Sequence, residues 1–224
     1  MAEIPAIRVA TRPSRAPLFR AAMLAAGLGL SGCATPGPMA PPVPPAGQVN
    51  VAPGIAFSLL APATLGRTVE AAQLVTARYQ NETFVFETRI SVTPARLLIV
   101  GTDMMGRRAM TIEWAGDTLK VEAAPWVPAR LSASNVIADI MLLHWPENAV
   151  RAGLMPKGLN GAGATPRVSI NETKPGHRVI TVDGRDMISI DRIAGAPGSW
   201  NGRWTYRNDG WDYGLDIQST ETAP

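Results

Sequence analysis

The chain has 224 residues, of which 46% are hydrophobic, and this is enough for one domain to bury a core. Its single cysteine excludes a disulfide framework within the chain and a cysteine-rich metal site. The net charge of +3 comes from the first 32 residues, which contain four arginines and one glutamate. The other 192 residues carry 17 basic and 17 acidic side chains and have no basic stripe. This balance argues against a nucleic-acid partner.

Residues 1–32 have the order of parts of an export signal. Arg15 and Arg20 precede an uncharged apolar run at 21–30, and small residues follow it. A run of about ten residues is too short for a transmembrane helix, which needs about 20. We therefore expect residues 1–32 to be a signal peptide that is removed.

The end of this segment, Leu30-Ser31-Gly32-Cys33, resembles the lipobox of bacterial lipoproteins. The resemblance implies that the thiol of Cys33 receives a diacylglycerol thioether, that the chain is cut before it, and that the new amino group is acylated. Ala34 stands where an aspartate retains many Gram-negative lipoproteins in the inner membrane, so the resemblance implies the outer membrane, facing the periplasm. The alternatives are a secreted protein with a free cysteine and a cytosolic protein with an Ala-rich N-terminal helix.

The next segment, 33–54, combines the cysteine with a stretch dense in proline and glycine and nearly free of charge. This composition favours an extended, partly stiff tether over a packed element. Such a tether would give the domain reach from a membrane, or would serve only as spacing. We expect the folded domain to occupy residues 55–224.

From about residue 67 the sequence shows short runs of alternating apolar and polar residues between turns, the pattern of antiparallel strands. In the run 83–92, Phe84 and Phe86 share one face of the strand with Thr88 and Ile90. The strands predicted before the helical region are 69–79, 83–92, 96–101, 109–114 and 118–123.

One clear helix is predicted over 132–146, where apolar residues recur near helical spacing between a polar N-cap segment and Pro146. A second short helix is expected to begin at Pro146-Glu147. Strands then resume at 167–172, 177–182, 186–193, 203–208 and 213–218. The order predicts a mainly β fold, a strongly curved antiparallel sheet whose concave face the inserted helices cover.

The segment VIADIMLLHWP at 136–146 resembles a family of bacterial outer-membrane lipoproteins that carry a similar Ala-Asp, apolar, Trp-Pro segment. That family is similar to LolB, the outer-membrane receptor for lipoproteins, and its relatives are often encoded beside aryl polyene or fatty-acid synthesis genes. The resemblance covers roughly residues 65–218. It implies an open half-barrel with an apolar cavity of lipid size.

A second point of resemblance is the predicted hairpin tip at 102–106, which is similar to the Pro-Leu-Gly tip of LolB. Met104 replaces the proline and Met105 replaces the leucine, so the apolar character is kept. Arg107 and Arg108 follow as a basic collar. An apolar tip with a basic collar is suited to contact with anionic lipid, and the alternative is ordinary turn packing.

Seven apolar or aromatic residues are candidates for lining the cavity, although a tryptophan beside a proline is more often structural filling. They are Phe84, Phe86, Trp126, Ile137, Ile140, Met141 and Trp145.

Catalysis has little support in the sequence. Asp139 and His144 are five residues apart, off a common helical face, and no nucleophile motif lies near them. No calcium loop or two-histidine zinc motif is present. We therefore expect a protein without catalytic residues, metal or cofactor.

The function expected is binding or transfer of an acylated molecule in the periplasm, either a lipoprotein or a polyene or glycolipid. The partners would be this acyl cargo, the inner leaflet of the outer membrane and a soluble carrier of the LolA kind. The alternative is a structural or assembly lipoprotein that binds another protein.

Overall fold

The computed structural model describes residues 47–128, 131–156 and 165–222. All of them belong to one compact unit, Pro42–Pro224, and the other unit, Met1–Pro41, lies outside the described residues.

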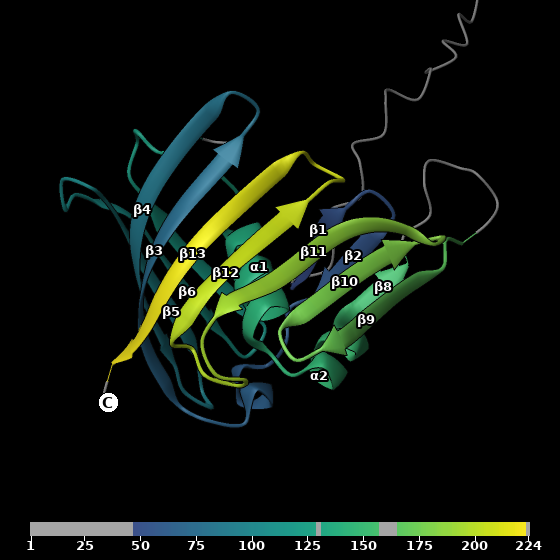
Figure 1. The fold of residues 1–224 in the computed structure, drawn as a ribbon. Helices are drawn as coiled ribbons and strands as arrows, with labels where there is room; N and C mark the ends of the chain where they lie inside the picture. The colour runs from purple at the N-terminus through teal and green to yellow at the C-terminus, as the bar shows by residue number, and fades with distance from the viewer. Residues whose placement is uncertain (1–46, 129–130, 157–164, 223–224) are drawn as a thin grey trace, which may run out of the picture. The chain divides into compact units, whose positions relative to one another are not determined.

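Ten antiparallel strands form the main sheet, in the order β7-β6-β5-β4-β3-β13-β12-β11-β10-β9 (Figure 1). The sheet consists of two meanders, β3 to β7 and β9 to β13. They meet where β13, the last strand of the sheet in chain order, pairs with β3, the first. Within the described residues the sheet is open, with β7 and β9 at its two edges. The strands are β3 (Val69–Tyr79), β4 (Glu82–Val92), β5 (Leu97–Asp103), β6 (Arg108–Ala115), β7 (Thr118–Ala123), β9 (Val168–Lys174), β10 (His177–Val182), β11 (Arg185–Ala194), β12 (Gly202–Asn208) and β13 (Tyr213–Thr222).

The long hairpin of β3 and β4 follows from the alternation seen in the sequence. The two strands pair over their whole length, from Val69 with Val92 to Tyr79 with Glu82. Cross-strand partners share a face, so the inward side chains of both strands form one apolar surface. The predicted hairpin is confirmed.

A smaller three-stranded sheet contains β1 (Gln48–Ala52), β2 (Ile55–Ser58) and β8 (Leu154–Pro156). The tether was expected to continue to residue 54, but β1 is already a strand, with Val51 1% exposed. Its short alternation of valines was hidden among prolines and glycines, and it buries those valines against the rest of the core. The remainder of the expected tether, 33–46, lies outside the described residues.

Two α-helices, α1 (Ala133–His144) and α2 (Glu147–Gly153), connect the two meanders, and a short 3-10 helix, η1 (Pro62–Leu65), follows β2. Both α-helices begin close to where the sequence placed them. Ser132 precedes α1 in an extended conformation without capping through its side chain, and Pro146 precedes α2 rather than lying in its first turn. In the described residues no helix has the length and hydrophobicity to cross a bilayer.

The C-terminal end of α1 is tied to the sheet by the buried side chain of Arg178. Its guanidinium donates hydrogen bonds to the carbonyls of Leu142 and Trp145, and it pairs with Glu172 at 2.9 Å. Carbonyls at a helix end lack partners within the helix and carry partial negative charge, so a guanidinium satisfies both needs. The position of α1 on the sheet is therefore fixed at this end.

The described structure is mainly β, with a large antiparallel sheet and helices inserted between two runs of strands, and this part of the prediction is confirmed. The half-barrel stays a prediction.

Candidate functional site

A cavity of about 550 Å³ lies between α1 and the main sheet. This volume is within the range of about 300–1,000 Å³ that small-molecule sites occupy. Its walls come from strands β3, β4, β5, β6, β12 and β13, from α1 and from the segment before α1. Apolar side chains dominate the lining, among them Val75, Ile99, Met110, Val136, Leu143 and Ile217.

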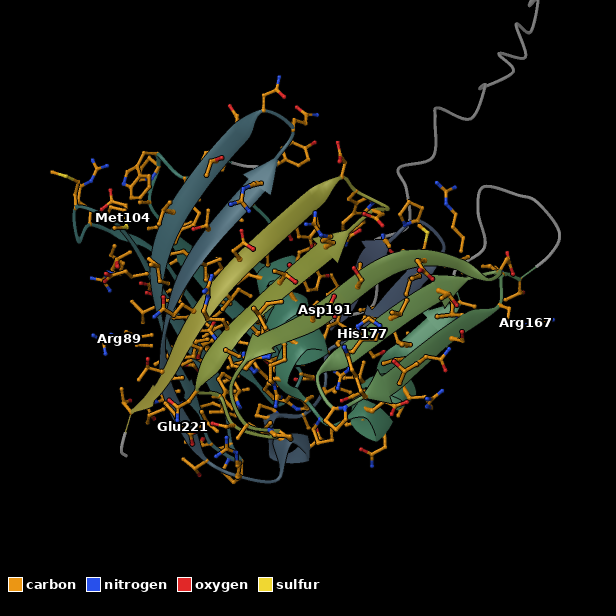
Figure 2. The ribbon with its side chains drawn as sticks, viewed as in Figure 1. Arg89, Met104, Arg167, His177, Asp191 and Glu221 are labelled. Carbon is orange, nitrogen blue, oxygen red and sulfur yellow. The ribbon has the colours of Figure 1, made fainter. Side chains whose placement is uncertain are left out.

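Phe84 and Phe86, two of the residues expected in a cavity wall, line this cavity. They pair across the hairpin with Ala77 and Val75, so all four side chains point to the same face of the sheet. The two rings lie 6.3 Å apart between centroids. The residues that alternate with them along β4 face the other way, and Figure 2 shows one of these, Arg89, pointing outward, away from α1.

From α1, Val136, Asp139, Ile140 and Leu143 reach the cavity. Their spacing of three and four residues places them on one helical stripe. Ile140, which was expected from the sequence in a cavity wall, is among them.

Ile137, Met141 and Trp145 were also expected in the cavity wall, and the structure places them outside the lining. They are at most 1% exposed and belong to the packed core. Met141 and Trp145 face the segment after β2: the amide of Leu60 donates to the Met141 sulfur at 3.2 Å, and the Trp145 indole donates to Thr64 at 2.9 Å. Because α1 is apolar on several sides, its sequence did not show which side faces the cavity.

Trp126 was expected in the cavity too, and the structure places it elsewhere. The side chain is 42% exposed and is absent from the lining. The guanidinium of Arg107 lies 4.9 Å from the centroid of its ring, a cation–π contact. Trp126 thus lies beside the β5–β6 tip.

The polar centre of the cavity is a cluster that the sequence did not reveal, formed by Asp139, Tyr206 and Tyr213. The Tyr206 hydroxyl lies 2.7 Å from Oδ1 of Asp139, and the Tyr213 hydroxyl lies 2.8 Å from both carboxylate oxygens. Burial raises the pKa of Asp139 to about 7, although the hydrogen bonds from both tyrosines act in the opposite direction. Burial also raises the pKa of each tyrosine well above its ordinary value, so both stay protonated and act as donors.

His144 lies outside this cluster and outside the cavity lining. Its ring stacks on Trp200 at 3.8 Å between centroids and contacts the amide nitrogen of Gln73 at 3.0 Å. Burial, then the positive charges of three arginines, lower its pKa to about 3, so the ring is neutral. Asp139 and His144 have different partners and do not form a catalytic pair.

The β5–β6 turn carries the predicted membrane-contact residues at the surface. Met104 is 61% exposed and Met105 is 82% exposed, and Figure 2 shows Met104 at a projecting end of the molecule. Arg107 and Arg108 are exposed beside them. The exposed patch formed by Met104, Met105, Trp126, Arg107 and Arg108 is called the β5–β6 tip patch below.

Asp103 shapes this turn. Its carboxylate accepts hydrogen bonds from the backbone amides of Met105 and Arg107, both at 2.9 Å, and from the Arg107 side chain at 2.7 Å. Burial raises the pKa of Asp103, but these hydrogen bonds outweigh it and hold the pKa below its ordinary value. Gly106 adopts a left-handed conformation with φ of 75°, which closes the turn. The local polar network therefore leaves the two methionines facing outward.

No group of three or more histidine, cysteine or acidic side chains in the described ranges is arranged to hold a metal ion. Cys33, the predicted lipidation site, lies outside the described residues. The cavity thus offers a mainly apolar space whose polar groups include the carboxylate of Asp139, the hydroxyls of Tyr206 and Tyr213 and the guanidinium of Arg78.

A family profile described as "Protein of unknown function (DUF3261)" matches residues 70–221. The chain belongs to this family. The matched segment begins within β3 and ends within β13, so it contains the whole ten-stranded sheet apart from its outermost residues, with α1 and α2. The DUF3261 segment therefore contains the whole cavity wall. No curated protein matches the chain.

Proposed function

We propose that this protein is a lipid-anchored lipoprotein of the outer membrane that binds the acyl chain of a periplasmic lipid or lipoprotein in the cavity between α1 and the sheet. The observation that supports the proposal best is the cavity itself, with its predominantly apolar walls. If α1 served only to stabilise the fold, larger side chains in this space would make the protein more stable, because voids in a core are destabilising.

Binding in this cavity requires no cofactor or nucleotide. Each methylene that leaves water contributes roughly 0.8 kcal/mol, so a chain of moderate length offsets the cost of being held in place. A chain can pass from a soluble carrier of the LolA kind to this cavity and then to a bilayer by exchange between apolar surroundings. In this proposal the open sheet with α1 over one face acts as a half-barrel of the LolB kind.

The β5–β6 tip patch supports transfer to a membrane. Its exposed methionines and Trp126 are suited to the boundary between headgroups and acyl chains, and its two arginines to anionic headgroups. The tip continues β5 and β6, whose Gly101, Ala109 and Met110 line the cavity. Cargo binding and membrane contact therefore belong to one hairpin.

A matched pair of substitutions on β3 tests cargo binding. Ala77→Trp adds a large ring on the cavity face, whereas Thr76→Trp adds the same ring on the opposite face of the same strand. Overfilling a packed space costs about 1–3 kcal/mol, so Ala77→Trp should retain roughly tenfold less acyl ligand than Thr76→Trp.

The measurement is mass spectrometry of solvent extracts from the full chain, carrying Cys33→Ser so that it is purified without detergent. Melting temperatures measured in parallel verify that both variants fold. Acyl molecules in the parent and in Thr76→Trp, with loss in Ala77→Trp, support the proposal. Absence of acyl molecules from every form contradicts it and favours a structural lipoprotein that binds another protein.

A further inference from the structure

The polar cluster in the cavity contains a negative charge without a positive partner. Asp139 lines the cavity and is only partly exposed, yet none of the ion pairs in the described part of the chain includes it. Arg78, which also lines the cavity, pairs with Asp216. Removing a carboxylate from water is costly unless a cation or several donors compensate it.

The two tyrosines compensate only part of that cost. Each hydroxyl has one proton to donate, whereas an ionised carboxylate offers about four acceptor positions on its two oxygens. The rise in the pKa of Asp139 to about 7 reflects this incomplete compensation. Acceptor capacity toward other groups of the protein therefore remains at a residue that borders the apolar cavity.

A purely structural role would not require the charge. The hydrogen bonds join α1 to β12 and β13, and a neutral amide at this position would also accept a hydrogen bond from a tyrosine. What the carboxylate adds is attraction for a cation and repulsion of an anion in a space of low dielectric constant.

We propose that Asp139, Tyr206 and Tyr213 form a subsite for the head of a long-chain amine, with the ammonium group on Asp139 and the chain along the apolar wall. The assignment rests on the proposed function, because it requires that the cavity holds an alkyl chain. The ammonium supplies both the missing positive charge and the missing donors. A carboxylate or phosphate head placed there would meet Asp139 with like charge, and a hydroxyl would donate without neutralising the charge.

The experiment compares dodecylamine, dodecanol and dodecanoate by titration calorimetry against the full chain carrying Cys33→Ser. Measurements at about pH 8 keep Asp139 mainly ionised, since its pKa is about 7. Charge-assisted hydrogen bonds are roughly twice as strong as neutral ones, so we expect dodecylamine to bind at least about tenfold more tightly than dodecanol, with dodecanoate weakest.

Asp139→Asn is the diagnostic variant, and Asp191→Asn is its matched control. Asp191→Asn removes the same charge from β11. The Asp191 side chain, however, pairs with His177 on the face of the sheet that points away from α1 (Figure 2). We expect Asp139→Asn to lose the preference for the amine and to keep its affinity for dodecanol. Asp191→Asn should behave as the parent does.

Equal binding of the three amphiphiles, or an unchanged preference in Asp139→Asn, overturns the amine subsite and leaves the proposed function standing. Preference for dodecanol over dodecylamine overturns the amine subsite and indicates a ligand with a hydroxyl head. Failure of the parent to bind any of the three amphiphiles overturns both proposals. If Asp139→Asn unfolds, Tyr213→Phe replaces it and is measured at about pH 9, because loss of the Tyr213 hydrogen bond raises the pKa of Asp139 further. This change removes a donor and keeps the charge, so the amine preference should persist or increase, and its loss overturns the amine subsite.

Discussion

Asp139 and His144 both lie half-buried on α1, and the loss of hydration moves their pKa values in opposite directions. The pKa of Asp139 rises to about 7 and that of His144 falls to about 3. In each case burial disfavours the charged form. The two groups therefore make opposite contributions to the dependence of stability on pH.

The first prediction concerns the free energy of unfolding of Asp139→Asn. Asp139 titrates near pH 3.8 in the unfolded chain and near pH 7 in the folded chain, so between these values the folded chain holds the extra proton. Its stabilising contribution is present below about pH 4 and is lost as the pH rises to about 7. At 1.36 kcal/mol per pH unit, the loss is at most roughly 4 kcal/mol.

His144 contributes with the opposite sign. Its folded pKa is depressed, so its contribution is present above pH 6.5 and is lost as the pH falls towards about 3. The measurement is therefore the difference in urea unfolding between the parent and Asp139→Asn at several values from about pH 4 to pH 8. We expect the variant to gain stability relative to the parent as the pH rises. Parallel curves for the two proteins would contradict the buried, strained state of Asp139.

At the scale of single residues, the sequence predicted only part of the cavity. Phe84 and Phe86 were found because strict alternation assigns strand residues to faces. Tyr206 and Tyr213 were missed because their partner Asp139 lies 67 and 74 residues away, and no local pattern joins them. The Asp-Tyr-Tyr cluster exists only after the second meander packs against α1.

Among the elements, the β5–β6 hairpin combines a polar turn with an apolar surface. Asp103 holds the backbone of the turn through its hydrogen bonds. The side chains of Met104 and Met105 are largely exposed to solvent, so they add little to the packing of the hairpin. The turn geometry thus depends little on the methionine side chains. A substitution at Met105 should change the surface of the tip without unfolding it.

The second prediction is that Met105→Glu slows delivery of cargo and leaves cargo binding intact. A glutamate would have to enter lipid, where an ionised side chain costs several kcal/mol unless it is paired. The measurement is transfer of a labelled acyl molecule from the Cys33→Ser chain to anionic liposomes, with cargo retention and melting temperature measured in parallel. We expect transfer to fall by roughly tenfold or more.

Asn81→Glu is the control, because it adds the same charge to the exposed turn between β3 and β4. It should transfer cargo as the parent does. Normal transfer by Met105→Glu would return Met105 to the role of an ordinary turn residue. Loss of both binding and transfer would mean that the tip helps to form the cavity.

The helix α1 shows how an element can be predicted while its orientation is not. Its spacing of apolar residues and the following Pro146 predicted its limits closely. Its apolar residues, however, cover more than one side, since Ile137 and Met141 pack in the core while Ile140 and Leu143 reach the cavity. Only tertiary contacts, such as those of Trp145 with Thr64, decide which side faces the sheet.

In the folded unit as a whole, the pairing of β13 with β3 joins the beginning and the end of the DUF3261 segment. The sequence predicted both strands but not their contact, because pairing between distant strands leaves no local periodicity. β2 and β8, which the sequence did not predict as strands, also pair over a long distance: β8 follows α2 directly and returns to pair with β2. The cavity depends on these long-range pairs, since β3 and β13 both contribute to its wall.

The proposed function also requires an attachment to the membrane, which we predict at Cys33. Residues 34–46 would then connect the lipid to β1. At up to ~3.1 Å per residue, an extended Pro-rich segment of this length spans roughly 40 Å. A membrane-held protein with such a tether would meet soluble carriers and the bilayer with the same domain.

The last prediction tests this attachment in the intact chain. Cys33→Ser should abolish labelling by palmitate and leave an uncleaved or soluble protein, because a serine hydroxyl does not form the thioether on which processing depends. Ser31→Ala is the control, since it preserves the cysteine and a small residue beside the cleavage point, and it should stay labelled in the outer membrane. Ala34→Asp should stay labelled but move to the inner membrane, because an aspartate after the lipidated cysteine retains many Gram-negative lipoproteins there. The measurement is palmitate label in each protein after membrane fractionation. Label in the Cys33→Ser protein would place the lipid on another residue and contradict the anchor at Cys33.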